Sequence, residues 1–309
     1  MTTETVSAPI QVTDAAWKAI EGGYDIQVHV APDVIARRID DLDLAKEFRS
    51  HGLKGFVLKS HYAPTYERAK VVTKASPGIT AFGAITLNHA VGGLNPVALE
   101  IAGRSGNKIC WFPTVDAANE TAGRTDGPTD KLPFWAKIQR ELSATGISPA
   151  PISVFDESGK ISNQVKRCLE LIAKHDMVLA TGHLSKKEIH ALVKTAKKEM
   201  GLRRVVVTHA EFPSQNMTAQ EQVEVADLGA MIEHCFTTMY TNKAPWDGYF
   251  DSVRKVGPER VVLSTDLGQT INPPVADGFA MFAQKMLDAG FSAADVHRMC
   301  VTNTTHIVA

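Results

Sequence analysis

The 309-residue chain lacks the features that most directly reveal a membrane, secreted or nucleic-acid-binding protein. No apolar run approaches the roughly 20 residues that cross a bilayer, and the first residues lack the basic start and apolar core of a signal peptide. Neither sign of charge dominates, since 33 Lys and Arg stand against 34 Asp and Glu, so no basic footprint for nucleic acid is indicated. We therefore expect a cytoplasmic protein that binds neither nucleic acid nor membrane.

Common chemical motifs are also missing. The four cysteines are widely separated and form no CxxC pair, which argues against a disulfide framework or a zinc ribbon. The phosphate-binding patterns GxGxxG and GxxxxGK[ST] are absent, and so is the GxSxG elbow of serine hydrolases. Nucleotide cradling and serine nucleophiles are therefore disfavoured.

What the chain does contain is a repeated strand–helix pattern. Eight short apolar stretches end in polar residues, and most of their ends are about 25–32 residues apart, the length of one strand, one helix and two loops. This spacing predicts an α/β fold, a (β/α)₈ TIM-like barrel formed by a single domain over residues 1–309. The predicted strands cover residues 24–30, 53–61, 78–88, 107–115, 175–183, 202–209, 228–236 and 259–266.

One interval breaks the rhythm. About 70 residues separate the ends of the fourth and fifth predicted strands, more than twice what a helix and two loops need. We expect an insertion over roughly 115–160, which would emerge at the face where barrel enzymes have their active sites. It could form a lid or the contact of a homo-oligomer.

Seven of the eight predicted strands end in a side chain that could bind a metal or transfer a proton. In a barrel these ends converge at the carboxyl-terminal face. His nitrogen and carboxylate oxygen are ligands for zinc and similar ions. The strand ends therefore predict a divalent-metal site, zinc first with manganese or iron as alternatives, held by His29, His183, His209 and Asp266.

This arrangement resembles the amidohydrolase superfamily along essentially the whole chain. VLATGH supplies His183, VVVTHAEFP supplies His209 and VVLSTD supplies Asp266, in the order that the superfamily shows. The segments HVAPD, FVLKSHYAPT and LNHAVGGLNP look like those of an uncharacterised amidohydrolase-like family.

Two departures from the superfamily pattern bear on how many metal ions the site is expected to hold. The first strand of the superfamily carries HxH, but here the first position is Gln27, whose amide oxygen is a weak zinc ligand. The fourth strand ends in Trp-Phe-Pro (111–113) and lacks the carboxylated lysine that bridges two metals in many members. A single ion is therefore favoured, although His61, His89 and Glu233 could hold a second ion, as in PHP-type phosphoesterases.

Roles follow from charge. Asp266 would act as general base and later deliver the proton to the leaving group, and His209 would bind the metal or donate to a developing oxyanion. Lys59 would bind a substrate carboxylate or stabilise negative charge, unless it forms a salt bridge with Asp25 or Glu233. The residues expected to contact or orient the substrate are His61, Asn88, His89 and Glu233.

The first hypothesis is a metal-dependent hydrolase that activates water to cleave a C–N or C–O bond in a small molecule: an amide, cyclic imide, lactone or ester. A metal-dependent nonoxidative decarboxylase of a small carboxylic acid is the second, because decarboxylating relatives can also lack the first histidine. A PHP-like phosphoesterase and a non-catalytic ligand-binding barrel remain as further alternatives.

Overall fold

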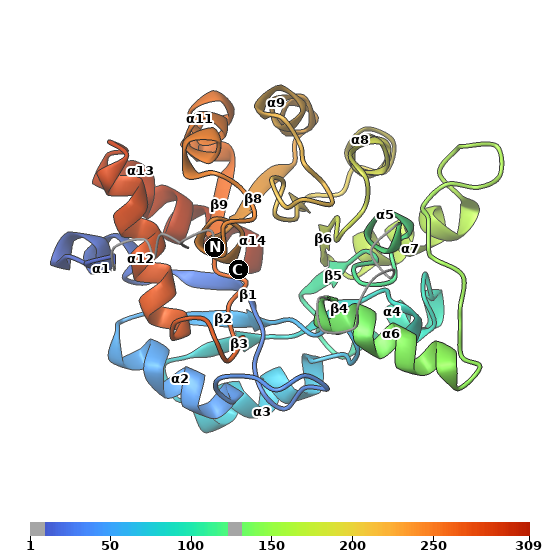
Figure 1. Ribbon diagram of the computed structural model, residues 1–309, viewed down its shortest axis with the longest axis horizontal. Coiled ribbons are helices and arrows are strands. Elements are labelled where there is room, and N and C mark those ends of the chain that lie inside the picture. The colour runs from blue at the N-terminus through green and yellow to red at the C-terminus, as the bar shows by residue number, and fades with distance from the viewer. Residues whose placement is uncertain (1–9, 123–131) are drawn as a thin grey trace, which may run out of the picture.

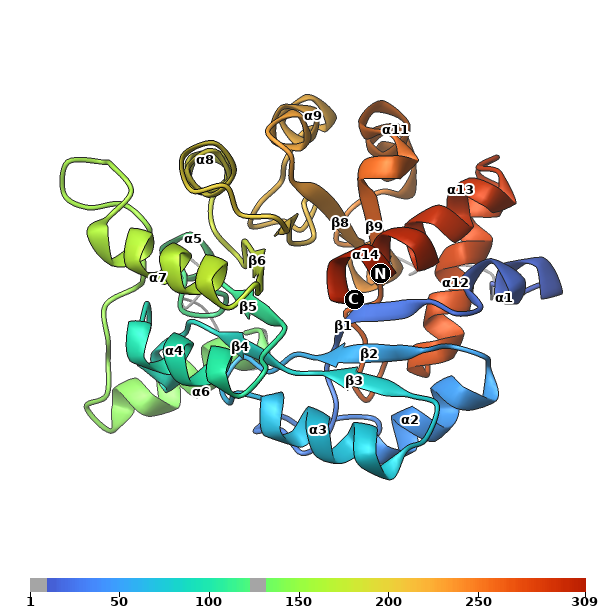
Figure 2. The same ribbon diagram turned by 180° about the vertical axis from the view of Figure 1, so that it is seen from behind.

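The computed structural model describes residues 10–122 and 132–309. Its strands form a ring with the helices on the outside (Figures 1 and 2). Every pair of hydrogen-bonded neighbours is parallel, in one sheet of order β1-β2-β3 and a second of order β4 to β9. The strands are β1 Tyr24–Val28, β2 Gly55–Leu58, β3 Thr80–Phe82, β4 Ala84–Thr86, β5 Ile109–Trp111, β6 Val178–Ala180, β7 Val205–Val207, β8 Met231–Cys235 and β9 Val261–Ser264.

These strands confirm the predicted α/β barrel fold. All eight predicted strands occur, and the third is divided at Gly83 into β3 and β4. The first and last strands are joined at their carboxyl ends by backbone hydrogen bonds rather than by a continuous ladder. The His29 amide donates to the Leu267 carbonyl at 2.8 Å, and the Asp266 amide donates to the Gln27 carbonyl at 2.9 Å.

Helices alternate with the strands, and several of them begin with a strong start signal. Asn95 caps α4 and is followed by proline, whereas Ser185 and Thr218 form capping boxes with Glu188 and Glu221. The helices around the ring are α1 Asp14–Ile20, α2 Asp41–Ser50, α3 Tyr66–Ala75, α4 Pro96–Arg104, α7 Asn163–Lys174, α8 Lys186–Lys194, α9 Ala219–Asp227, α10 Phe236–Tyr240, α11 Trp246–Val256, α12 Val275–Asp288, α13 Ala293–His297 and α14 Asn303–Val308.

The extra residues between β5 and β6 precede α7, in agreement with the predicted position of the insertion. They contain the short helices α5 Ala118–Thr121 and α6 Phe134–Ala144, and a turn closed by an antiparallel bridge between Phe155 and Ile161. This segment lies to one side of the ring, near β4 and α4 (Figures 1 and 2). The part of the predicted insertion at 123–131 lies outside the described residues.

The barrel interior is filled below the strand ends. Inward side chains of alternating strand residues form one apolar cluster, which α14 closes from below with Ile307 and Val308. A second cluster packs the outer strand faces against the surrounding helices. Among the helices of the described ranges, none has the length and apolar character needed to cross a bilayer. The packed floor leaves the polar strand ends gathered at the opposite, carboxyl-terminal end.

Candidate active site

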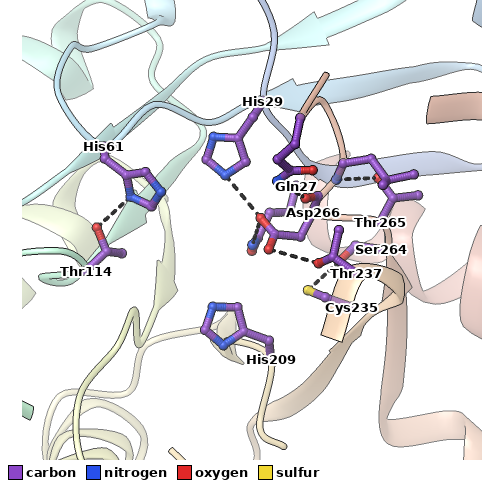
Figure 3. A network of polar contacts seen from close by, with 12 residues as sticks. Gln27, His29, His61, Thr114, His209, Cys235, Thr237, Ser264, Thr265 and Asp266 are labelled. Atoms are coloured by element: carbon purple, nitrogen blue, oxygen red, sulfur yellow. Dashed lines mark hydrogen bonds and ion pairs between the residues drawn. The ribbon is translucent and has the colours of Figure 1, made fainter. Parts of the chain in front are cut away.

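Four histidines and one aspartate meet at the mouth of the barrel, and Figure 3 shows His29, His61 and His209 around Asp266. His183 Nε2 lies 3.2 Å from His209 Nε2, and His29 Nε2 lies 3.1 Å from Asp266 Oδ1. The ring of His61 is 4.9 Å from that of His29 and 5.9 Å from that of His183, centroid to centroid. The convergence expected from strand order is thus present in three dimensions.

The backbone at these strand ends adopts conformations that ordinary strands avoid. His209 has φ of 27° and Asp266 has φ of 53°, both in the left-handed region, where non-glycine residues cost about 1–3 kcal/mol. Gly182 and Gly268 flank the site for a related reason. A Cβ on Gly182 would lie 2.2 Å from the Phe112 carbonyl oxygen, and one on Gly268 would lie 1.5 Å from the His29 carbonyl oxygen. Strain and close approach therefore coincide with the predicted site, as is common where geometry serves function.

Asp266 is fully engaged by donors. Gln27 Nε2 donates to Asp266 Oδ1 at 2.8 Å, beside His29, and Thr237 Oγ1 donates to Oδ2 at 3.1 Å. Burial alone raises the pKa of the carboxyl, but the hydrogen bond from His29 and the charge of Lys59 outweigh it and hold that pKa well below its usual range. Asp266 is therefore a carboxylate.

His29 has a charged partner on each side of its ring. Its Nδ1 lies 3.3 Å from an Arg37 guanidinium nitrogen, and Arg37 is fixed by Asp33 at 2.6 Å. Because a guanidinium can only donate, Nδ1 must accept, and the single hydrogen of the neutral ring sits on Nε2. Burial, aided by Arg37, lowers the pKa of His29 to about 4, so the ring is neutral. With its hydrogen on Nε2, His29 can donate to Asp266 Oδ1 at 3.1 Å, and its assignment as a metal ligand stays a prediction.

The charge behind the ring of His183 is negative, unlike the positive charge behind His29. Glu120 Oε2 lies 3.3 Å from His183 Nδ1, so a carboxylate stands behind this ring, while Nε2 is directed at His209. Burial, followed by the proximity of His183, lowers the pKa of His209 well below its usual value. The His209 ring is therefore a neutral imidazole.

This pair fits a metal ion, although the set is incomplete. In the part of the chain that the structure describes, no three His, Cys, Asp or Glu side chains form a group that could hold a metal. Two imidazole nitrogens bound tetrahedrally to one zinc at 2.0–2.1 Å are about 3.3 Å apart, close to the 3.2 Å between the Nε2 atoms of His183 and His209. The donor chemistry thus fits one ion at that pair, near Asp266.

Of the predicted substrate-binding residues, Asn88 has a structural role, and His89 lies apart from the other histidines. Asn88 Oδ1 accepts from the Thr114 amide, and its Nδ2 donates to Thr114 Oγ1 and the His61 carbonyl, so the amide ties strand ends together. His89 lies outside the histidine cluster, with Nε2 2.8 Å from the Ala150 carbonyl oxygen. The second-ion set of His61, His89 and Glu233 therefore does not assemble.

His61 and Glu233 stay close to the site. Thr114 Oγ1 lies 2.8 Å from His61 Nδ1, and burial lowers the pKa of that imidazole well below its usual value. Ser264 Oγ donates to Glu233 Oε1 at 2.8 Å, and burial raises the pKa of Glu233 to about 7. On the outer face of β8, His234 Nδ1 lies 2.6 Å from Glu211 Oε2.

Lys59 is buried, with 2% of its surface exposed, and its Nζ lies 5.2 Å from the centroid of the Trp111 ring. The alternative salt bridge with Asp25 or Glu233 does not form. Thr265 donates to Asp25 through both its amide and its hydroxyl, and burial raises the pKa of Asp25 to about 7.

A cavity of about 760 Å³ opens beside the cluster. Tyr62, the neighbour of His61, lines it on the barrel side with His89 and Asp116, and α6 contributes Gln139 and Leu142. The insertion therefore forms one wall of a space large enough for a small organic molecule.

Several site residues escaped the sequence prediction. Asp33 lies within the quoted segment HVAPD, which gave no reason to assign it a partner, and Arg37 follows in a loop without periodicity. Glu120 belongs to the insertion, whose path to the barrel mouth could not be inferred. Thr237 follows β8 on α10 and carries no motif of its own.

Comparisons with known proteins agree with this architecture. No curated protein matches the chain. An amidohydrolase from Pseudomonas aeruginosa superposes with a TM-score of 0.58 at 11% identity, covering 95% of this chain and 97% of the other. A protein assigned as a 2-pyrone-4,6-dicarboxylic acid hydrolase from Pseudomonas putida gives 0.56 at 15%, covering 93% and 97%. A protein assigned as a metal-dependent hydrolase from Lactobacillus casei gives 0.57 at 12%, covering 96% and 98%.

The fold is therefore the barrel seen in amidohydrolases, as the sequence resemblance implied. The family itself is set by a sequence model rather than by these distant structures. The model of a family of unknown function, DUF6282, matches residues 22–233, which hold most of the candidate site. The chain belongs to this family of unknown function.

Proposed function

We propose that this protein is a metal-dependent hydrolase that cleaves a C–N or C–O bond in a small molecule. The observation that carries the proposal is the His183–His209 pair, whose Nε2 atoms are 3.2 Å apart beside a buried carboxylate at the barrel mouth. The names of the structurally similar amidohydrolase, 2-pyrone-4,6-dicarboxylic acid hydrolase and metal-dependent hydrolase support the same class of reaction.

His183, His209 and Asp266 are the residues that would hold the cation, with zinc as our first candidate and manganese or iron as alternatives. A bound divalent cation would polarise a carbonyl and make water more acidic. Glu120 supports this assignment, because a carboxylate behind a histidine is the usual outer partner of a metal ligand.

The protein's own side chains would then transfer the proton of the attacking water. Asp266 takes the proton from the attacking water and returns it to the leaving nitrogen or oxygen. Gln27 and His29 hold Oδ1 in place, so the carboxylate keeps one orientation through both steps. His61 stands at the edge of the cluster toward Tyr62, where an imidazole N–H can donate to the oxygen of the reacting carbonyl.

The substrate would occupy the cavity beside Tyr62, with its carbonyl directed toward the histidines. The insertion wall then acts as a cover that limits substrate size and excludes water. Amides, cyclic imides, lactones and esters all present the required carbonyl.

The first test is metal content by elemental analysis, after purification without chelator. We expect one ion per chain in the wild type, loss of that ion in His183→Ala and His209→Ala, and retention in His190→Ala, which removes an exposed histidine of α8. Failure of the wild type to take up any divalent ion would overturn the proposal.

The loaded protein is then assayed against amides, cyclic imides, lactones and esters, with carbon dioxide release followed in parallel on small carboxylic acids. Hydrolysis that is lost in His183→Ala supports the proposal. Release of carbon dioxide without hydrolysis would assign the site to decarboxylation instead.

A further inference from the structure

The barrel interior contains a buried lysine that forms no ion pair within the described residues. Lys59 is 2% exposed, and in the described ranges no carboxylate forms an ion pair with its Nζ. It lies two residues beyond Val57, a member of the inner apolar cluster, so its side chain enters the barrel interior. An unpaired ammonium in such a place costs free energy unless an anion accompanies it.

The nearby carboxyl groups are engaged elsewhere. Asp266 receives hydrogen bonds from Gln27, His29 and Thr237. Asp25 accepts from Thr265, and Glu233 accepts from Ser264. Burial raises the pKa of Asp25 and of Glu233 to about 7, so neither fully offsets the positive charge near neutral pH.

Lys59 and Asp266 carry opposite charges that cancel, and Asp25 and Glu233, with pKa values of about 7, are each only partly ionised at neutral pH. A divalent cation at His183 and His209 would therefore still leave the interior with an excess of positive charge. Part of that excess is removed if the substrate itself carries a negative charge, and Lys59 is the group placed to bind it.

A second donor lies on the same wall. Trp111 carries the ring beneath Lys59 Nζ, and its buried Nε1 has no hydrogen-bond partner in the described structure. An indole N–H can only donate. An ammonium and an indole N–H on one wall suit the two oxygens of a carboxylate.

We propose that Lys59, together with Trp111 Nε1, forms a subsite for a substrate carboxylate, so that the substrate is a small carbonyl compound bearing a carboxylate group. A monoanion matches the single ammonium, whereas a phosphate dianion would add repulsion with Asp266. This inference rests on the proposed hydrolase function, which it extends to a substrate class.

The test uses benzoate and its uncharged analogue benzamide as probes, with inorganic phosphate as the competing anion, in titration calorimetry. The proteins are the wild type, Lys59→Met and the matched control Lys54→Met, an exposed lysine just before β2. Each is measured in metal-free and metal-loaded form. Lys59→Gln carries the same expectation should Lys59→Met fail to fold.

We expect benzoate to bind the wild type and Lys54→Met alike and to bind Lys59→Met roughly 10- to 100-fold more weakly, the range for a charged hydrogen bond. Benzamide should not distinguish the proteins. Equal benzoate binding by wild type and Lys59→Met, or no binding at all, overturns the subsite. Lys59-dependent binding of phosphate in place of benzoate overturns the carboxylate assignment.

Comparison of the metal-free and metal-loaded proteins distinguishes a failure of this inference from a failure of the proposed function. Lys59-dependent benzoate binding in a protein that takes up no metal would support the subsite and overturn the hydrolase. Benzoate binding that needs metal but not Lys59 would overturn the subsite and leave the hydrolase standing.

Discussion

His29 at the end of β1 and His183 at the end of β6 are both strand-end histidines with almost no exposed surface, yet opposite charges stand behind them. Arg37 faces Nδ1 of His29, whereas Glu120 faces Nδ1 of His183. A cation behind the ring fixes the hydrogen on Nε2, and a carboxylate fixes it on Nδ1. The partner behind an imidazole therefore decides whether its front atom donates a proton or offers a lone pair.

This difference changes the role of the whole β1 end. Gln27 and His29 both donate to Asp266 Oδ1, so the pair that corresponds to HxH orients a carboxylate. The substitution of the first histidine by Gln27 is consistent with this arrangement, since an amide N–H does the same work as the Nε2–H of His29.

The largest expected effect is on metal binding, and it tests directly whether His183 and His29 have different roles. His183→Ala should weaken metal binding by more than the roughly 100-fold that loss of an outer partner costs, whereas His29→Ala should retain about one ion per chain. His29→Ala should instead lower kcat, because Asp266 loses a donor. Elemental analysis and competition with a fluorescent chelator measure the first effect, and steady-state kinetics the second.

His29→Gln serves as the matched variant, because its amide can replace the Nε2–H donor but lacks an imidazole. Recovery of kcat in His29→Gln relative to His29→Ala supports a donor role. Loss of the ion from His29→Ala to the same extent as from His183→Ala would show that the two strand ends are equivalent and would refute the comparison.

A smaller effect on metal affinity is expected from a change at Glu120, the residue behind His183. Glu120→Gln keeps the shape of the side chain but removes the charge that holds the Nδ1 hydrogen, so metal affinity should fall roughly 10- to 100-fold. Glu141→Gln, the same change at an exposed residue of α6, should leave it unaltered. Chelator competition measures both, and an unchanged affinity in Glu120→Gln would remove the carboxylate from the comparison.

The barrel and its strand ends could be predicted from sequence because apolar strands of regular spacing place His183, His209 and Asp266 at one face. The roles of His29 and Asn88 could not, since they depend on partners contributed by distant segments. Arg37 comes from a loop and Thr114 from the residues after β5. Strand periodicity specifies where a side chain points, whereas its protonation and hydrogen bonds depend on neighbours that only the folded chain brings together.

Glu233 extends the comparison of the two histidines to a buried carboxyl group that, among the described residues, has no charged hydrogen-bond partner. Its donor is the uncharged hydroxyl of Ser264. Burial raises the pKa of Glu233 from 4.5 to about 7, so the folded protein binds a proton that the unfolded chain releases over this interval. Its contribution to stability is therefore complete below the unfolded pKa and is lost as pH rises to the folded value. The unfolding free energy of wild type minus that of Glu233→Gln should fall by at most about 1.4 kcal/mol per pH unit between these values and then level off.

Urea unfolding across this pH interval measures the difference, with Glu141→Gln run in parallel to remove effects common to any lost surface charge. Glutamine retains an oxygen that accepts from Ser264, so the comparison isolates the proton. A difference that does not change with pH would mean that Glu233 is ionised in the folded protein, with Lys59 as the charge that compensates it. Lys59 would then be paired with Glu233, which would remove the basis of the carboxylate subsite. The contrast between Arg37 behind His29 and Glu120 behind His183 would be unaffected.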